Sequence, residues 1–414
     1  MNLLTLAAAD LRHRPLPNFL HLVLLGLGIA MITALLLIST QISGRLQRDA
    51  NGVDLVLGAK GSPLQLILST VYHLDIPTGN IPLDEANHWA SNPMIAEAIP
   101  LSLGDNARGF RIVGTTPALL KHYGARFAQG QVWDAPMQTV VGSEVAQSGF
   151  VNGATFIGMH GLGASGHAHA DHQYRVVGVL APTGTVLDRL ILTSLDSVWE
   201  VHGAHHHDAD EHDDDDHAED HAASGDGAAN YNAAKEITAM LMTYRTPLAA
   251  ASLPRMINTQ SKLQAAVPAM ETARLLNLLG LGFDTLRALA AVLIVAAALS
   301  VFVALYTAME TRQYDLAVLR SLGVSRGRVV ALLWIQALSL SIAGTLIGLL
   351  LGHGAVEAMG RVAGTGRNVS LTGLTLQADE LAILLLPLLV GTLAALLPAW
   401  RAYRSDVAAT LSQS

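Results

Sequence analysis

The chain has 414 residues, of which 51% are hydrophobic and 14% are charged, and its mean hydropathy is +0.39. Such a composition is unusual for a water-soluble protein and indicates an integral membrane protein. The formal net charge is −8, but nine of the 33 acidic residues fall within residues 202–221, so the charge is local. Cysteine is absent, which excludes disulfides, thiolate metal sites and cysteine nucleophiles.

Four uncharged apolar segments dominate the sequence, and each supplies the roughly 20 residues that cross the hydrocarbon core of a bilayer. We therefore expect transmembrane helices. A cleaved signal peptide is the alternative for the first segment, but its apolar stretch is long and residues 39–42 form a poor cleavage site, which favours a retained anchor. The expected helices span residues 19–42, 285–309, 329–353 and 381–400.

Arginines beside these segments predict the orientation, because positively charged residues favour the cytoplasmic side of a membrane. Arg12 and Arg14 precede the first segment, several arginines lie between the second and third, and Arg401 follows the fourth. We expect both termini in the cytoplasm, and since an outer domain without cysteine is compatible with a bacterial periplasm, the expected location is a bacterial inner membrane. The predicted cytoplasmic parts are residues 1–18, 310–328 and 401–414, and the predicted outer parts are residues 43–284 and 354–380.

Residues 43–284 are predicted to form a periplasmic α+β domain, because strand-like segments alternate with turns and short helical patterns. The clearest strand is 174–180, and 236–245 is expected to return to the domain as another. The low-complexity segment 202–230 is expected to be a disordered loop. Helices are expected at residues 64–71, 144–147, 246–263 and 259–284. The predicted fold is thus four transmembrane helices with a large α+β domain between the first and second.

The loop between the second and third segments is the most specific stretch of the chain. As a helix it places Leu316, Leu319 and Gly323 on one side. Gly323 can end this helix, and Ser325 can cap the next one. An amphipathic helix at this place either lies in the lipid interface or docks into another protein, and its residues alone leave both alternatives open.

This loop resembles the E-x-R-x-x-[DE]-[IL]-x-[VI]-L-R-x-[LI]-G-x-[ST] stretch of FtsX-like permeases, the membrane subunits of MacB-type (type VII) ABC transporters. Asp315 stands where glutamate is more usual, which is a conservative departure. The resemblance extends to the layout of the spans, to the strand at 176–180 and to the C-terminal segment 398–404. The matching positions are Glu310, Arg312, Asp315, Leu316, Val318, Leu319, Arg320, Leu322, Gly323 and Ser325.

The resemblance implies a non-catalytic permease subunit that works as a dimer and transmits nucleotide-driven movement along its first two helices to the outer domain. ATP is expected to bind to a separate ATP-binding subunit, since Gly58 to Ser62 places its lysine before the last glycine and is no P-loop. A periplasmic adaptor or binding protein and membrane lipid are further expected partners, whereas nucleic acid is not. The residues expected to couple to the ATPase are Glu310, Arg312, Asp315, Leu316, Leu319, Arg320 and Gly323.

Histidine is concentrated between residues 160 and 221, which hold 11 of the 17 histidines. In a first group, His167, His169 and His172 with Asp171 form a donor set suited to zinc or another borderline divalent metal. A second group, 202–221, is expected to chelate such metals weakly. The alternatives are a surface loop with incidental histidines and a solvated acidic linker. Candidate ligands of the second group are His205, His206, His207, His212 and His217.

Two functional hypotheses from different classes therefore remain. The first is a permease subunit of an ABC complex, with a link to the handling of zinc or another divalent metal. The second is a membrane-anchored periplasmic metal sensor without an ATPase partner, which accounts for the histidines but leaves the 310–325 motif unexplained. A membrane-embedded enzyme has little support, because the sequence contains no nucleophile–base motif and no HExxH.

Overall fold

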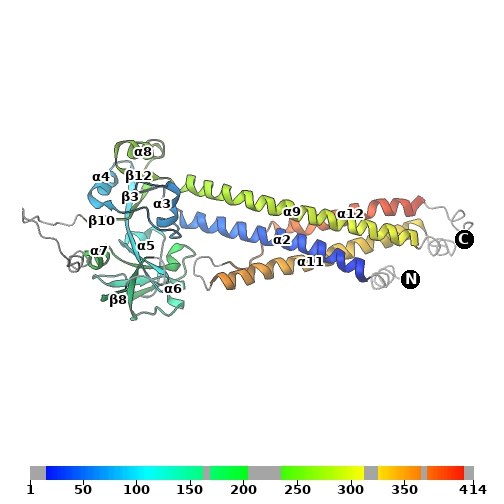
Figure 1. Cartoon of the computed structure of the whole chain (residues 1–414), viewed down its shortest axis with the longest axis horizontal. Coiled ribbons are helices and arrows are strands. Elements are labelled where there is room, and N and C mark those ends of the chain that lie inside the picture. The colour runs from blue at the N-terminus through cyan, green and yellow to red at the C-terminus, as the bar shows by residue number, and fades with distance from the viewer. Residues whose placement is uncertain (1–14, 162–167, 204–234, 312–324, 365–370, 405–414) are drawn as a thin grey trace, which may run out of the picture. The chain divides into compact units, whose positions relative to one another are not determined.

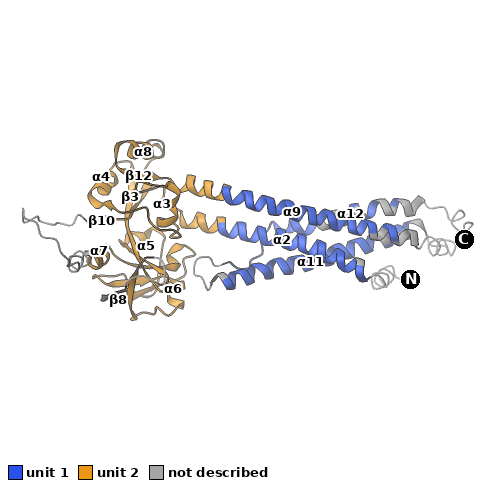
Figure 2. Cartoon of the chain, in the orientation of Figure 1, with its two compact units in different colours: residues 1–42, 278–414 blue, residues 43–277 orange. Residues whose placement is uncertain are grey.

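The computed structural model describes residues 15–161, 168–203, 235–311, 325–364 and 371–404. The chain divides into two compact units, which Figure 2 distinguishes by colour. Unit 1 comprises residues 1–42 and 278–414, and unit 2 comprises residues 43–277. Unit 1 is helical, whereas unit 2 combines strands with shorter helices (Figure 1).

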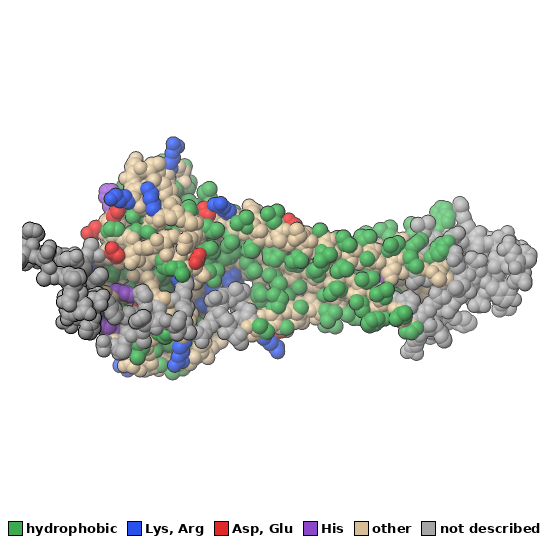
Figure 3. All heavy atoms as spheres, in the orientation of Figure 1, with side chains coloured by type: hydrophobic (Ala, Val, Ile, Leu, Met, Phe, Trp, Pro, Cys, Tyr) green, Lys and Arg blue, Asp and Glu red, His purple; other side chains and the backbone are tan. Residues whose placement is uncertain are grey.

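Long helices account for unit 1, namely α2 Pro15–Asp49, α9 Pro268–Thr311, α11 Arg326–Gly364 and α12 Glu380–Arg404. Hydrophobic side chains cover their surface in Figure 3, and Leu27, Val295 and Leu350 are 53%, 66% and 75% exposed. Such an apolar surface is stable in lipid and unfavourable in water. Three segments of the described helices are long and apolar enough to cross a membrane: Asn18–Asp49, Pro268–Val303 and Val330–Val362.

The four predicted spans all fall within these helices, but α12, which contains 381–400, is not among the three candidate segments. The coarser prediction of a membrane protein with several apolar helices and a large α+β domain is confirmed. Two family models together match residues 19–236 and 287–407. The number of spans and their limits stay predictions.

Helices α2 and α11 approach each other closely at small residues within unit 1. A Cβ atom added at Gly348 would lie 2.6 Å from the Cβ of Ile29 and 2.7 Å from the carbonyl oxygen of Gly26. Backbones that pack this closely gain van der Waals contact, which matters in lipid because the hydrophobic effect does not drive helices together there. Glycine at 348 is therefore required by the packing.

Unit 2 is built on a 10-stranded mixed sheet and a separate 2-stranded sheet of β2 and β10. The strands of unit 2 are β1 Leu55–Ala59, β2 Ile81–Pro82, β3 Ile95–Ala107, β4 Phe110–Thr115, β5 Phe127–Gly130, β6 Gln138–Val141, β7 Thr155–His160, β8 Ala168–Leu180, β9 Leu190–Ser194, β10 Glu236–Ile237, β11 Ala239–Tyr244 and β12 Leu263–Ala266. Its shorter helices are α3 Pro63–Thr70, α4 Leu83–Ala90, α5 Ala118–His122, α6 Ser143–Gln147, the 3₁₀ helix η1 Val186–Arg189, α7 Leu195–Gly203 and α8 Pro247–Gln260.

Part of this sheet closes on itself. The pairs β3–β4, β4–β9, β9–β6, β6–β8, β8–β7 and β7–β3 form a ring, in which β4–β9 and β6–β8 are parallel and the others antiparallel. Closure satisfies backbone groups that an open sheet would leave at its edges. Outside the ring, the sheet continues from β3 through β11 and β1 to β12.

Two hydrophobic cores correspond to these two parts. The first core joins β1, β11 and α8 through residues such as Leu57, Met240 and Leu253, and the second lies among the ring strands, with Tyr174 and Val176 of β8 fully buried. Strand β3 contributes to both cores. In Figure 1, α8 and α4 accordingly lie at one end of unit 2, and β8 and α6 lie at the other.

Several local predictions for this unit coincide with observed elements. The predicted strand 174–180 lies in β8, the predicted strand 236–245 is divided between β10 and β11, and the predicted helix 64–71 corresponds to α3. One prediction was wrong: residues 259–284 are not continuously helical, because β12 pairs with β1 before α9 begins at Pro268. Residues 204–234, which hold most of the predicted disordered loop, lie outside the described residues.

Candidate functional site at the C-terminal end of α2

The turn between β8 and η1 is held in one conformation by a single carboxylate. Asp188 accepts hydrogen bonds from the backbone N–H groups of Thr183, at 2.9 Å, and Gly184, at 2.7 Å, and from the Thr183 hydroxyl at 3.0 Å. Gly184 has a positive φ of 69°, which glycine adopts without strain. The turn therefore presents the carbonyl oxygen of Gly184 in a fixed position.

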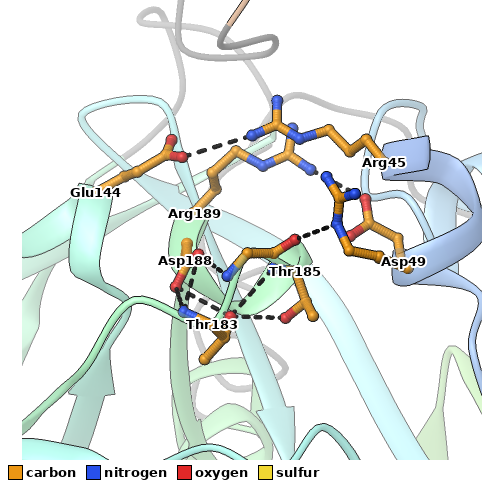
Figure 4. Close-up of polar contacts among 9 residues, drawn as sticks. Arg45, Asp49, Glu144, Thr183, Thr185, Asp188 and Arg189 are labelled. Atoms are coloured by element: carbon orange, nitrogen blue, oxygen red, sulfur yellow. Dashed lines mark hydrogen bonds and ion pairs between the residues drawn. The ribbon is translucent and has the colours of Figure 1, made fainter. Parts of the chain in front are cut away.

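The last turns of α2 bind this turn and the 3₁₀ helix after it. The Arg48 Nε–H donates to the carbonyl oxygen of Gly184 at 3.0 Å, and Asp49 forms an ion pair with Arg189 at 3.4 Å. The side chains of Arg189 and Asp49 are only 10% and 2% exposed. Figure 4 shows these groups converging between the end of α2 and the ring strands. We call the contacts of Arg45, Arg48 and Asp49 with Glu144, Gly184 and Arg189 the ionic junction.

A second ion pair lies at the rim of the ionic junction. Arg45 and Glu144, which is on α6, are 3.6 Å apart, and their side chains are 20% and 37% exposed. Because residues three and four apart share one face of a helix, Arg45, Arg48 and Asp49 all project from the same side of α2. One helix face thus carries both the buried and the partly exposed ion pair.

Burial sets the electrostatics of this site. Burial lowers the pKa of Arg189, and the nearby Arg45 lowers it further, whereas Asp49 opposes both effects. Asp49 therefore supplies the charge that lets a guanidinium remain buried here. The Tyr123 hydroxyl, whose pKa is raised by burial, donates to the backbone carbonyl oxygen of Asp49 at 2.6 Å and fixes the end of the helix from the α5 side.

A neutral histidine lies close to Arg189 and to Arg111 of β4. Burial, then Arg111, then Arg189 lower the pKa of His73 to about 3. Its Nδ1 atom is buried without a hydrogen-bond partner among the residues that the structure describes, and its φ of 54° lies in the left-handed region. His73 is therefore uncharged in the folded domain at neutral pH.

The second long helix that enters unit 2 is held by a different contact. The hydroxyl groups of Tyr72, which follows α3, and Thr272, in the first turns of α9, are 2.5 Å apart. The Thr272 hydroxyl also donates to the carbonyl oxygen of Pro268 at 2.6 Å. Helix α3 packs beside β1 and β12, so α9 is attached on the side of the first core. Helix α2, by contrast, is bonded to the turn that joins two ring strands.

Comparisons with known proteins decide the family. The family model described as a MacB-like periplasmic core domain matches residues 19–236, more than half of the chain, and the model described as an FtsX-like permease C-terminal region matches residues 287–407. The chain belongs to the family of MacB/FtsX-like ABC transporter permeases. The family resemblance predicted from the sequence is confirmed.

Two solved structures are similar to parts of this permease. The periplasmic region of MacB from Actinobacillus actinomycetemcomitans is 9% identical, with a TM-score of 0.34, and the match covers 55% of this chain and 95% of that one. The extracellular domain of the noncanonic ABC-type transporter YknZ from Gram-positive bacteria is 8% identical, with a TM-score of 0.31, and the match covers 51% and 98%. A comparison with curated proteins gives no match.

The coupling residues predicted for this permease mostly lie outside the described residues. Glu310 is near the C-terminal end of α9, where only the backbone is described, and Arg312, Asp315, Leu316, Leu319, Arg320 and Gly323 belong to the undescribed segment 312–324. Their role stays a prediction.

The predicted metal ligands are also described only in part. His169, Asp171 and His172 lie on β8, and of these only the His172 side chain is described, as half-buried. His167 and the candidates His205, His206, His207, His212 and His217 lie outside the described residues. Among the side chains that are described, no group of three or more histidines and carboxylates is placed to hold a metal ion.

The ionic junction was not predicted from the sequence. The spacing of Arg45, Arg48 and Asp49 on one helix face was a usable signal for a contact surface, but it did not reveal the partner, since Arg189 is 140 residues away.

Proposed function

We propose that this permease transmits ATP hydrolysis in a separate ABC subunit to its periplasmic domain through α2 and α9. Permeases of this family work with an ABC ATP-binding subunit. The observation that carries the proposal is the ionic junction, because a buried ion pair and a hydrogen bond join the end of α2 to the turn and the helix η1 that connect the ring strands β8 and β9. A shift of α2 would thus pull or push directly on the segment that connects two strands of the ring.

The different attachments of the two helices support this mechanism. Helix α2 is bonded to the turn between β8 and η1, whereas α9 is bonded through Tyr72 to the side of the first core. Movement of one helix relative to the other would therefore change the position of the ring relative to the first core. No substrate channel through the membrane helices is needed for such mechanical work.

Residues 310–325 are proposed to receive the movement at the cytoplasmic side. Glu310, Arg312 and Arg320 would contact the ATP-binding subunit, and Leu316, Leu319 and Gly323 would form the apolar side of the same surface. In this proposal the permease has four spans and both termini in the cytoplasm of a bacterial inner-membrane protein. It pairs with a second copy, as a homodimer in the simplest case.

We further propose that the mechanical work serves the handling of zinc or another borderline divalent metal. The support is the donor chemistry of the two histidine groups, 160–172 and 202–221, both of which fall in the periplasmic part. Neutral imidazole and carboxylate groups together suit such metals better than they suit magnesium or calcium.

The test is affinity purification of the full chain from native membranes, followed by identification of stoichiometric partners. We expect an ATP-binding subunit that is retained by the wild type and lost from the Arg320→Glu variant. Arg274→Glu is the matched control, since it reverses an exposed charge near the first turns of α9, far in the sequence from the 310–325 motif, and should retain the partner. Absence of any ATPase from gently solubilised wild-type samples would refute the coupling proposal and favour the anchored metal sensor.

A further inference from the structure

The segment that precedes α12 carries two leucines with almost no protein around them. Leu374 and Leu376 are 82% and 84% exposed, more than any other large hydrophobic side chain of the described residues. The chain around them is uncharged, since no charged residue occurs between Arg367 and Asp379. Leaving two leucine side chains in water is unfavourable, so an apolar phase is the favoured surrounding. We call residues 371–379 the outer leucine segment.

The outer leucine segment is held against α11 by its backbone. Glu357 accepts hydrogen bonds from the N–H of Gly373 at 3.1 Å and from the hydroxyl of Thr372 at 3.3 Å. The Nδ1–H of His353 donates to the carbonyl oxygen of Gly373 at 2.6 Å. Gly373 is itself buried against the carbonyl oxygen of His353, where an added Cβ would clash. The position of the segment along α11 is therefore fixed.

A second set of contacts joins the outer leucine segment to α2. The side-chain amide of Gln41 accepts a hydrogen bond from the N–H of Thr372 at 3.0 Å and donates to its carbonyl oxygen at 2.8 Å. The Thr372 hydroxyl also accepts from the N–H of Leu374 at 3.1 Å. Gln41 and the outer leucine segment belong to the same compact unit. The two leucines thus extend from a backbone that is bonded to two long helices.

These contacts place the outer leucine segment where the apolar surface of α11 ends. Leu350, one turn before His353, is 75% exposed, and such a side chain faces lipid in a membrane permease. Charged side chains follow, beginning with Glu357. The segment meets His353 at Gly373, and it meets the same ring again at Glu380, whose Oε2 atom lies 3.3 Å from Nε2. The leucines between these two contacts therefore lie near the boundary between apolar and polar helix surface.

Exposed apolar side chains also follow the outer leucine segment. Leu381 and Leu385, in the first turns of α12, are 67% and 65% exposed. Both helices that flank the segment thus present apolar surface close to it. This continuity favours lipid as the surrounding of the leucines over a partner protein that would have to cover them alone.

We propose that Leu374 and Leu376 insert into the outer leaflet of the bilayer, at the boundary between headgroups and acyl chains. Apolar groups of interfacial segments reach about 5–10 Å into this boundary, whereas threonine hydroxyls and backbone groups stay among the headgroups. Through Gln41 the inserted segment anchors α2 at the point where this helix leaves the membrane. The inference rests on the four-span topology of the proposed function and is independent of ATPase coupling and of metal handling.

The experiment measures the depth of a nitroxide label on the full chain in lipid nanodiscs. A single cysteine is introduced as Leu376→Cys, and collision of the label with oxygen, which concentrates among acyl chains, is compared with collision with a water-soluble nickel complex. Leu350→Cys on α11 is the lipid reference. Val151→Cys, which is 58% exposed in unit 2, is the water reference. Thermal unfolding verifies that each labelled variant is folded.

We expect the oxygen-to-nickel collision ratio at 376 to exceed that at 151 several-fold and to approach that at 350. A ratio at 376 equal to that at 151 would overturn insertion. Protection of the 376 label from both reagents would also overturn it, because protein, such as a second copy of this chain, would then cover the leucines. A water-like ratio at 350 would refute the four-span topology itself, so the two failures are distinguishable.

A second variant tests the connection to α2. Gln41→Ala in the Leu376→Cys background should move the collision ratio at 376 towards the water value, because the segment loses its contacts with α2. Gln65→Ala is the matched control, since that amide also donates to a backbone carbonyl oxygen, that of Ile76 at 3.2 Å, but lies in unit 2. An equal ratio in the Gln41→Ala and Gln65→Ala variants would overturn the anchoring of α2 and keep insertion of the leucines.

Discussion

The ionic junction contains its own internal comparison, because one of its ion pairs is buried and the other is partly exposed. Replacing Asp49 with alanine removes the anionic partner of Arg189, whose side chain is 10% exposed. Loss of one member of a buried pair costs about 3 kcal/mol or more, since the remaining charge stays desolvated. For a domain of this size, that corresponds to a decrease of about 6–12 °C in Tm.

Arg45→Ala is the comparison, because its ion pair with Glu144 is partly exposed, with side chains 20% and 37% exposed. A partly exposed ion pair contributes about 1 kcal/mol at most, so this variant should lose at most about 4 °C. The assay is thermal unfolding of the full chain in nanodiscs, with hydrogen exchange of peptides covering 183–194 to locate the opening. The double variant Asp49→Ala/Arg189→Met should recover about 1–3 kcal/mol relative to the sum of the single changes. Equal shifts for Asp49→Ala and Arg45→Ala, or strict additivity, would refute this view of the junction.

Three further predictions concern single side chains. His73 has a folded pKa of about 3 against an ordinary value of 6.5, so the unfolded chain binds the proton first as pH falls. The domain should lose about 2 kcal/mol between about pH 8 and pH 5, and denaturant titrations of His73→Gln should show a smaller loss; an identical pH dependence in both would contradict the assignment. Gly348→Leu should destabilise the helices by about 1–3 kcal/mol through overpacking. Gly354→Leu on the same helix, where an added Cβ meets nothing within 4 Å, should be near neutral in detergent melting curves. Tyr72→Phe should cost about 1 kcal/mol, whereas Tyr244→Phe, whose buried hydroxyl has no partner in the described part of the chain, should not destabilise in the same melts.

Much of the fold could be predicted from the local pattern of apolar and β-branched residues in the sequence. The helices were predictable because a long apolar segment in lipid must satisfy every backbone group internally. Strand 174–180 was predictable because Val176, Val177 and Val179 favour extended structure. β12 was missed for the converse reason: Leu263 to Ala266 has no β-branched residue, and its pairing with β1, about 200 residues away in the chain, makes it a strand.

The candidate sites were harder to predict because they depend on contacts that sequence does not display. Asp49 and Arg189 are ordinary charges in isolation, and only the fold brings them together. His202 was grouped with the acidic segment after it, although it belongs to α7. The family motif at 310–325 was recognisable because its residues are contiguous.

The most direct test of coupling uses the natural absence of cysteine. Spin labels at Val151→Cys and Leu248→Cys, which are 58% and 69% exposed, report the distance between the ring and α8 by pulsed electron paramagnetic resonance. With the ATP-binding subunit present, we predict that a non-hydrolysable ATP analogue shifts this distance distribution and that Arg320→Glu abolishes the shift. An unchanged distribution in a complex that hydrolyses ATP would contradict transmission of the nucleotide state to the periplasmic domain.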